Sequence, residues 1–169
     1  MRKRKKKDNS SDKELAEELG LSIKYWRYKG RKGIYWYLFS EYVRKRDLFN
    51  WGRCISCDKE FGNIREVQAG HYAPAGNCGF GLLFDEMNVH AECAKCNNPL
   101  FSPGKLILYR RNLIDRYGED EVLKLDERYC KKVPTKEWTQ LQYIDEIEKL
   151  MAKTKKIDEE ISKKLKRGS

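Results

Sequence analysis

The amino-acid sequence predicts an α+β fold in which a small, glycine-rich central core is flanked by helices at both ends. Three observations lead to this class. Apolar residues recur at helical spacing before residue 50 and after residue 105. Between residues 54 and 98 that spacing is lost and short β-like segments replace it. The same central segment contains two closely spaced cysteine pairs.

The N-terminal part is predicted to consist of a basic tail and two helices. Residues 1–10 carry an unbroken run of Lys and Arg, which is typical of a disordered tail. The segment Ser11-Asp12-Lys13-Glu14 resembles a capping box, so we expect a short helix from there to Gly20. From Ile34 to Phe49 the pattern predicts a longer amphipathic helix.

Aromatic and basic side chains alternate between Tyr25 and Tyr37. This mixture suits stacking on nucleic-acid bases. It also suits a core helix whose cationic side chains reach solvent. The helical spacing of Trp36, Phe39, Tyr42 and Val43 favours a core position for these four.

In the central segment, β structure is predicted around Ile64–Ala69 and Leu82–Phe84, with no helix of useful length before Asn88. A helix then starts at Ser102-Pro103 and stops at Gly118, because Pro favours the first helical position and Gly the C-terminal cap.

Two helical segments are expected after Gly118. A short helical turn spans Glu119–Leu125, and a long helix opens at Pro134-Thr135. From Lys153 to Arg167 mixed charge predicts fraying. The expected apolar seam of the long helix comprises Trp138, Leu141, Ile144, Ile147 and Met151.

The charge of the chain favours a nucleic-acid partner. Its 169 residues carry a net charge of +10, and the excess is clustered. Clustered Lys and Arg bind phosphates with release of counterions, whereas the alternative is that the charge only confers solubility. No apolar stretch is long enough to span a bilayer, so we expect no membrane partner and a cytoplasmic location.

Two Cys-x-x-Cys pairs, Cys54/Cys57 and Cys93/Cys96, predict a structural zinc site. Two residues between thiolates let both sulfurs reach one ion, and two such pairs complete a tetrahedral site. A zinc-binding module without chemistry is the alternative. Cys78 and Cys130 have no such partner and are interpreted as free thiols.

Both histidines lie between the cysteine pairs. His71 follows Ala69-Gly70, His90 follows Asn88-Val89, and Asn97 follows Cys96. This order resembles the NinG/Rap family of lambdoid phage recombination endonucleases, whose core is an HNH-type, ββα-metal unit with a zinc frame. The pieces that carry the resemblance are Ser40–Asp47, Cys54–Cys57, Ala69–Tyr72 and Phe84–Asn97.

The resemblance implies a metal-dependent nuclease for branched DNA such as D-loops and Holliday junctions. His71 would be the general base, since a neutral imidazole can take a proton from water near neutral pH. Asn97 would bind a catalytic Mg²⁺ or Mn²⁺ ion through its carbonyl oxygen. Asn88 would hold the loop that carries His71, although a helix N-cap is an alternative role.

The sequence departs from common HNH sites at Gly70, where a metal-binding Asp or His is usual. The second protein ligand is therefore open. Asp85 is the first candidate and Glu86 another, His90 is less suitable, and an ordinary acidic turn is the alternative for the two carboxylates.

The expected organisation is a tail (1–10), a helical arm (11–33), a nuclease core (34–118) and a helical C-terminal region with a basic end (119–169). Phosphate contacts are expected from two helices, and shape rather than base sequence would select the DNA. The basic residues expected there are Arg44, Lys45, Arg46, Lys105, Arg110 and Arg111.

A homodimer is a further expected partner, because resolving a junction needs two cuts. Phage recombination proteins are also expected as partners. Two rival functions remain open at this stage. One is a zinc-stabilised DNA-binding module without catalysis, and the other is a sequence-specific HNH endonuclease.

Overall fold

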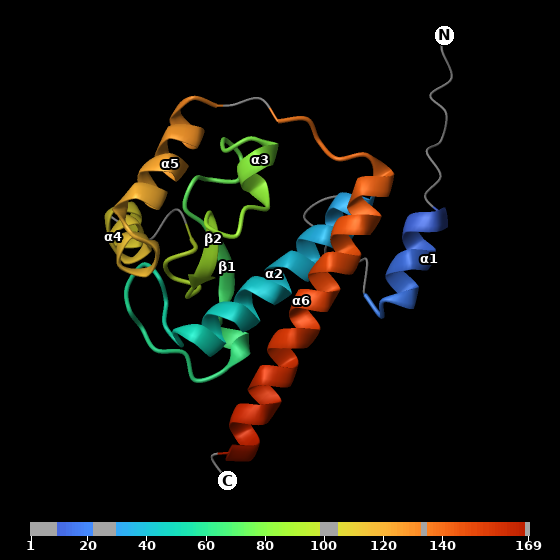
Figure 1. Ribbon diagram of the computed structural model, residues 1–169, viewed down its shortest axis with the longest axis horizontal. Coiled ribbons are helices and arrows are strands. Elements are labelled where there is room, and N and C mark those ends of the chain that lie inside the picture. The colour runs from blue at the N-terminus through green and yellow to red at the C-terminus, as the bar shows by residue number, and fades with distance from the viewer. Residues whose placement is uncertain (1–9, 22–29, 99–104, 133–134, 168–169) are drawn as a thin grey trace.

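The computed structural model describes residues 10–21, 30–98, 105–132 and 135–167 (Figure 1). The basic tail before residue 10, Tyr25–Lys29, Ser102-Pro103 and Pro134 lie outside these residues. The elements are α1 (Ser10–Glu18), α2 (Gly30–Asn50), the 3-10 turn η2 (Ile64–Glu66), β1 (Gln68–His71), α3 (Phe80–Leu83), β2 (Val89–Glu92), α4 (Lys105–Tyr117), α5 (Glu119–Cys130) and α6 (Gln140–Arg167). The predicted α+β class is confirmed.

The sheet is a two-stranded antiparallel hairpin in which Gln68 lies opposite Glu92 and His71 opposite Val89. Because side chains alternate along a strand, Gln68, Gly70 and Glu92 share one face and His71 lies on the other. The position of each residue in this ladder decides which side chains of the candidate site can meet.

The prediction of the second strand was wrong. Leu82 and Leu83 lie in the helical turn α3, where both are buried, and the partner of β1 is Val89–Glu92 instead. β2 is buried at every residue, including His90 and Glu92. Its sequence, Val-His-Ala-Glu, alternates apolar and polar residues as a half-exposed strand does, but both polar side chains are buried as well. Ile64–Glu66 likewise forms a 3-10 turn before β1.

Helix α2 is the central element, with the hairpin packed on one side and α6 on another (Figure 1). Its apolar residues Ile34, Phe39 and Val43 are almost fully buried. Burying each such side chain contributes about 1.5–3 kcal/mol. The core position predicted for Phe39, Tyr42 and Val43 is confirmed, and Trp36 packs against the same core.

Helix α6 begins at Gln140, later than predicted, and runs without fraying to Arg167. The predicted seam is confirmed in part: Ile147 is buried and Ile144 half-buried, whereas Leu141 is 73% exposed and Met151 43% exposed. Tyr143 and Leu150, which were not in the predicted seam, are buried. Trp138 lies before the helix and packs against the core.

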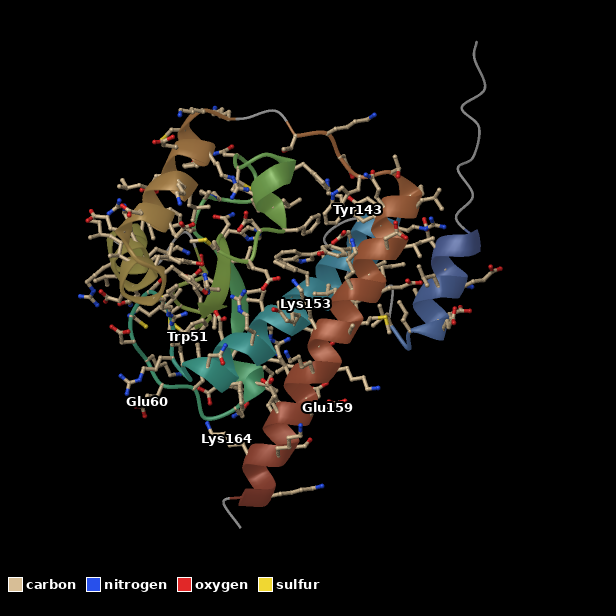
Figure 2. The ribbon with its side chains drawn as sticks, in the orientation of Figure 1. Trp51, Glu60, Tyr143, Lys153, Glu159 and Lys164 are labelled. Carbon is tan, nitrogen blue, oxygen red and sulfur yellow. The ribbon has the colours of Figure 1, made fainter. Side chains whose placement is uncertain are left out.

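The C-terminal half of α6 stays helical because it is tied to α2. Lys45 forms an ion pair with Asp158 at 3.0 Å, and Lys164 lies over the ring of Phe49 (Figure 2). None of the described helices combines the length and the apolar character needed to cross a bilayer.

Gly118 ends α4 as predicted and has a φ of 87°, which glycine adopts without strain. Helix α5 then continues to Cys130, beyond the short turn that was expected. Val122 and Leu125 are buried, and this packing favours the longer helix.

A buried charge network joins α2 to β2. Asp47, which has no exposed surface, accepts hydrogen bonds from Arg46 Nε (2.6 Å) and from the backbone N–H of Ala91 (2.7 Å), and lies 2.9 Å from His90 Nδ1. Burial opposes its ionisation, but the contacts with His90 and Arg46 outweigh it and lower the pKa of Asp47 to about 2. Burial also lowers the pKa of His90.

We expect Asp47→Asn to destabilise the fold by about 3–5 kcal/mol, because an amide leaves the buried Arg46 charge with only its longer ion pair to Glu86, at 3.6 Å. Urea unfolding of the metal-loaded protein measures this loss. Asp145→Asn, on the exposed face of α6, is the control and should stay within about 0.5 kcal/mol of the parent. Equal stability of the two variants would contradict the role of the network.

Candidate metal centre and neighbouring histidine

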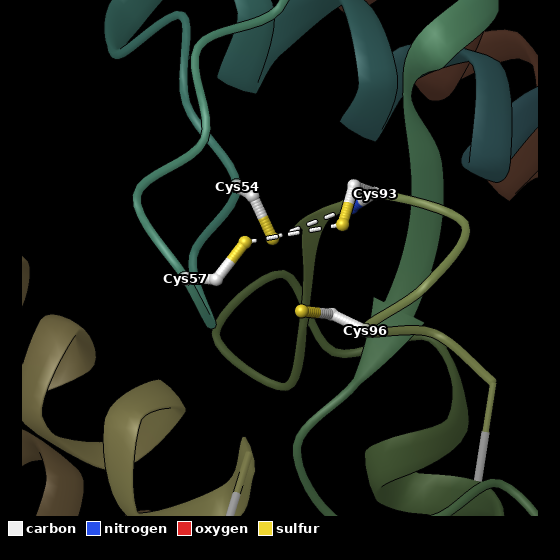
Figure 3. Close-up of side chains that lie close together, drawn as sticks. All are labelled: Cys54, Cys57, Cys93 and Cys96. Atoms are coloured by element: carbon white, nitrogen blue, oxygen red, sulfur yellow. Dashed lines mark hydrogen bonds between the residues drawn. The ribbon is translucent and has the colours of Figure 1, made fainter. Parts of the chain in front are cut away.

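Four cysteines converge from two loops that are far apart in the sequence (Figure 3). The ligand atoms of Cys54, Cys57, Cys93 and Cys96 all lie within 4.8 Å of one another. The first loop turns at Asp58, whose φ of 57° is left-handed and whose N–H donates to the Cys54 carbonyl. The backbone N–H of Cys93 also donates to Cys54 Sγ at 3.3 Å, which joins the two loops.

The donor set fits a thiophilic divalent cation. Burial raises the pKa of Cys54 to about 12, and burial together with neighbouring thiols raises the pKa of Cys96 still further above its usual value. Four thiols held this close are stabilised when a cation favours their thiolate forms. The cluster could therefore hold a metal ion such as zinc, as the cysteine spacing predicted. Cys78 and Cys130 lie outside it.

His71 ends β1 with its ring held from two sides. The imidazole stacks on Trp36 of α2, with the ring centroids 5.1 Å apart, and Nε2 lies 3.0 Å from the carbonyl oxygen of Leu83. A carbonyl only accepts, so Nε2 carries the proton of the neutral ring. Nδ1 is then the unprotonated nitrogen, the form that a general base requires.

Asn88 ties together the segments on either side of α3. It is fully buried, its Oδ1 accepts from the N–H of Ala73 at 2.7 Å, and its Nδ2 donates to the carbonyl of Leu82 at 2.8 Å. Since Leu83 fixes the His71 ring, this amide also helps to position His71. Asn88 precedes a strand, so the alternative interpretation as a helix N-cap was wrong.

A model of the family described as "Bacteriophage Lambda NinG protein" matches residues 1–160. The chain belongs to the NinG family. A NinG protein of Escherichia phage 933W is 31% identical over 121 residues, which are 70% of this chain and 53% of that protein. The NinG protein of Escherichia phage lambda is 30% identical over 121 residues, with 70% and 52% covered.

The NinG protein of Salmonella phage P22 is 33% identical over 110 residues, which are 63% of this chain and 47% of that protein. The chain thus spans about half the length of the curated relatives it matches. No solved structure matches it.

In this NinG-family chain, Asn97 and Asp85 lie toward opposite ends of the hairpin. Asn97 Nδ2 donates to Gln68 Oε1 at 2.9 Å, beside the end of the ladder where Gln68 faces Glu92. Asp85 lies before the other end, where it pairs with Arg128 at 2.7 Å and caps the N–H of Met87. This arrangement disfavours Asp85 and Asn97 as ligands of one ion.

The two other candidate ligands are also engaged elsewhere. Glu86 accepts from the Tyr42 hydroxyl at 2.8 Å and pairs with Lys153. His90 has no exposed surface and lies in the Asp47 network.

Sequence reasoning did not single out Glu92, a carboxylate with no exposed surface that comes directly before Cys93. Ser56 Oγ donates to it at 2.5 Å, and Lys105 Nζ lies 3.0 Å from its other oxygen. A side chain at Gly70 would overlap this carboxylate. The sequence could have indicated Glu92 only through the strand face that it shares with Gln68 and Gly70. Recognising that face requires the correct second strand.

The predicted phosphate-binding residues of α2 are not free surface groups. Arg46 is buried in its ion pair with Asp47, so assigning it to a DNA interface was wrong. Arg44 donates to the carbonyl of Ile64, and Lys45 pairs with Glu41 and Asp158. These side chains join α2 to its neighbours.

On α4, Lys105 faces Glu92, whereas Arg110 and Arg111 are more exposed. Both nevertheless have partners, Asp126 for Arg110 and Asp58 for Arg111. Arg110 and Arg111 therefore remain the two residues of the predicted set best placed to meet a phosphate.

We expect the purified protein to contain one tightly bound zinc ion, and Cys93→Ser to lose both the zinc and cooperative folding. Thiolate ligation of zinc contributes directly to folding, by about 10–16 kcal/mol in zinc-finger peptides. Metal analysis and circular dichroism measure the two effects. Cys130→Ser, which alters an exposed thiol outside the cluster, is the control. A folded Cys93→Ser variant with its full zinc content would contradict the assignment.

Proposed function

We propose that this NinG-family chain is a metal-dependent, structure-selective endonuclease that cuts branched DNA during phage recombination. One observation carries the proposal: the His71 ring stacks on Trp36 and its Nε2 lies 3.0 Å from the Leu83 carbonyl oxygen, a contact that favours the tautomer of a general base. The ring sits at one end of the hairpin, and the other end leads through Glu92 directly into the four-cysteine cluster.

In the proposed reaction, Nδ1 of His71 takes a proton from a water molecule. The water oxygen then attacks the scissile phosphorus, and the bond from phosphorus to the 3′ oxygen breaks. The Leu83 carbonyl keeps the ring oriented and stabilises the imidazolium that forms, because Nε2 keeps its hydrogen bond. Asn88 keeps that carbonyl in place. A bound Mg²⁺ or Mn²⁺ ion would supply positive charge for the phosphate and the leaving oxygen.

Zinc has a structural role in this proposal. The four cysteines fit a closed site in which protein sulfurs take every position, which leaves none for substrate. The ion would join the loop after α2 to the turn after β2 and so fix the hairpin that carries His71.

The charge of the chain supports a DNA partner, and the preference for branched DNA is what the resemblance of the sequence to the NinG/Rap family implies. The net charge of +10 suits contacts to the phosphate backbone, and such contacts select shape, not sequence. Arg110 and Arg111 of α4 would contribute to these contacts. A homodimer would supply the paired cuts that junction resolution requires.

We expect His71→Ala to lower the rate of nicking of a four-way junction by at least about 100-fold while binding is retained, because the variant removes the base but leaves charge and fold intact. Gel-based cleavage with Mg²⁺ or Mn²⁺ measures the rate, and mobility shift in a chelator measures binding. Glu148→Gln, exposed on α6, is the control.

Full activity of His71→Ala would exclude the role of His71. Tight junction binding by the parent protein without cleavage in either metal would favour a non-catalytic zinc module. Cleavage that follows base sequence regardless of branching would favour a sequence-specific enzyme.

A further inference from the structure

Glu92 is an acidic side chain with no exposed surface on the hairpin face that Gln68 and Gly70 share. Burying a carboxylate is costly unless hydrogen bonds and a nearby cation compensate for it. Ser56, located between the cysteines of the first pair, supplies a hydrogen bond at 2.5 Å. The compensating cation is the ammonium group of Lys105 at 3.0 Å.

Lys105 Nζ occupies a position lined by oxygen atoms. It contacts Glu92 Oε2 at 3.0 Å and the backbone carbonyl of Cys96 at 2.7 Å. Asn97 follows Cys96 directly and contacts Gln68, the residue opposite Glu92 in the ladder. Carboxylate, carbonyl and amide oxygens are the donors that Mg²⁺ and Mn²⁺ prefer.

Gly70 makes this arrangement sterically possible. A Cβ at position 70 would overlap the carboxylate carbon and oxygen of Glu92. The carboxylate therefore fills the space that a side chain preceding His71 would otherwise occupy. It brings an anionic group beside the residue that precedes the proposed base, although position 70 has no ligand of its own.

We propose that Glu92 is the anionic ligand of the divalent ion and that Lys105 holds the cation position when the ion is absent. The inference rests on the proposed function, since it names the ligand of that site. Lys105 is the exchangeable partner because its side chain is flexible and 21% exposed, so the ammonium can move to water. The Ser56 hydrogen bond keeps Glu92 oriented during the exchange.

The test measures binding of Mn²⁺ to the zinc-loaded full chain by the loss of the free-ion EPR signal, without DNA. We expect the parent protein to bind one Mn²⁺ in addition to its zinc. Glu92→Gln keeps the shape and the acceptor for Ser56, and should weaken Mn²⁺ binding tenfold or more. Lys105→Met removes the competing cation and should tighten binding several-fold.

Two further variants separate this role from a general effect. Glu159→Gln removes an exposed carboxylate of α6 and should bind Mn²⁺ like the parent (Figure 2). Gly70→Ala keeps the charge of Glu92 but displaces its carboxylate, and should weaken binding as Glu92→Gln does. Zinc content and melting temperature of each variant are measured in parallel.

Parent-like Mn²⁺ affinity in a folded Glu92→Gln variant overturns the proposal, and so does weaker binding in Lys105→Met. Absence of Mn²⁺ binding by the parent, combined with loss of zinc in Glu92→Gln, would make Glu92–Lys105 a purely structural ion pair. Binding through Glu92 without junction cleavage would sink the nuclease proposal but not this one. Cleavage that depends on His71 but not on Glu92 would contradict the role of Glu92 and leave the nuclease proposal in place.

Discussion

The closure of residues 54–96 by the four cysteines is the constraint on which the rest of the site depends. The hairpin inside this segment has only four residue pairs, and an isolated two-stranded hairpin is marginally stable in water. The cluster fixes the chain on both sides of the hairpin, through the Asp58 turn before β1 and through the turn after β2. Asp47 then attaches β2 to α2 through the N–H of Ala91. These attachments position the strand that ends at His71, and Trp36 and Leu83 then hold its ring.

The sequence was sufficient for features governed by local chemistry. The cysteine spacing identified the thiol cluster, and the Gly118 stop and the apolar spacing of α2 identified two helices. The position of the cluster between α2 and α4 followed as well. Each of these features has a short local signature, a Cys-x-x-Cys pair, a glycine stop or a helical spacing, so a single sequence contains the information needed to predict them.

The second strand and the seam of α6 were not predictable in the same way. β2 consists of Val-His-Ala-Glu, and its two polar residues are buried because Asp47, Ser56 and Lys105 come from distant parts of the chain to meet them. In α6, Tyr143 and Leu150 are buried because their face packs against α2 and the core, whereas Leu141 stays exposed. Tertiary contacts decide both outcomes.

The same burial changes how charged residues in this chain should be interpreted. In a basic sequence, Arg46 in a run of three cationic residues suggests a phosphate contact, yet its guanidinium is used to neutralise Asp47 inside the fold. Glu92 next to a cysteine of the cluster suggests an ordinary flanking charge, yet the absence of a side chain at Gly70 gives its carboxylate a buried place beside the residue that precedes the proposed base. Because a carboxylate can reach this space from the opposite strand, the glycine before His71 does not by itself remove the anionic ligand. What matters for a metal-dependent site is the position of the oxygen atoms, and the antiparallel ladder lets either strand supply them.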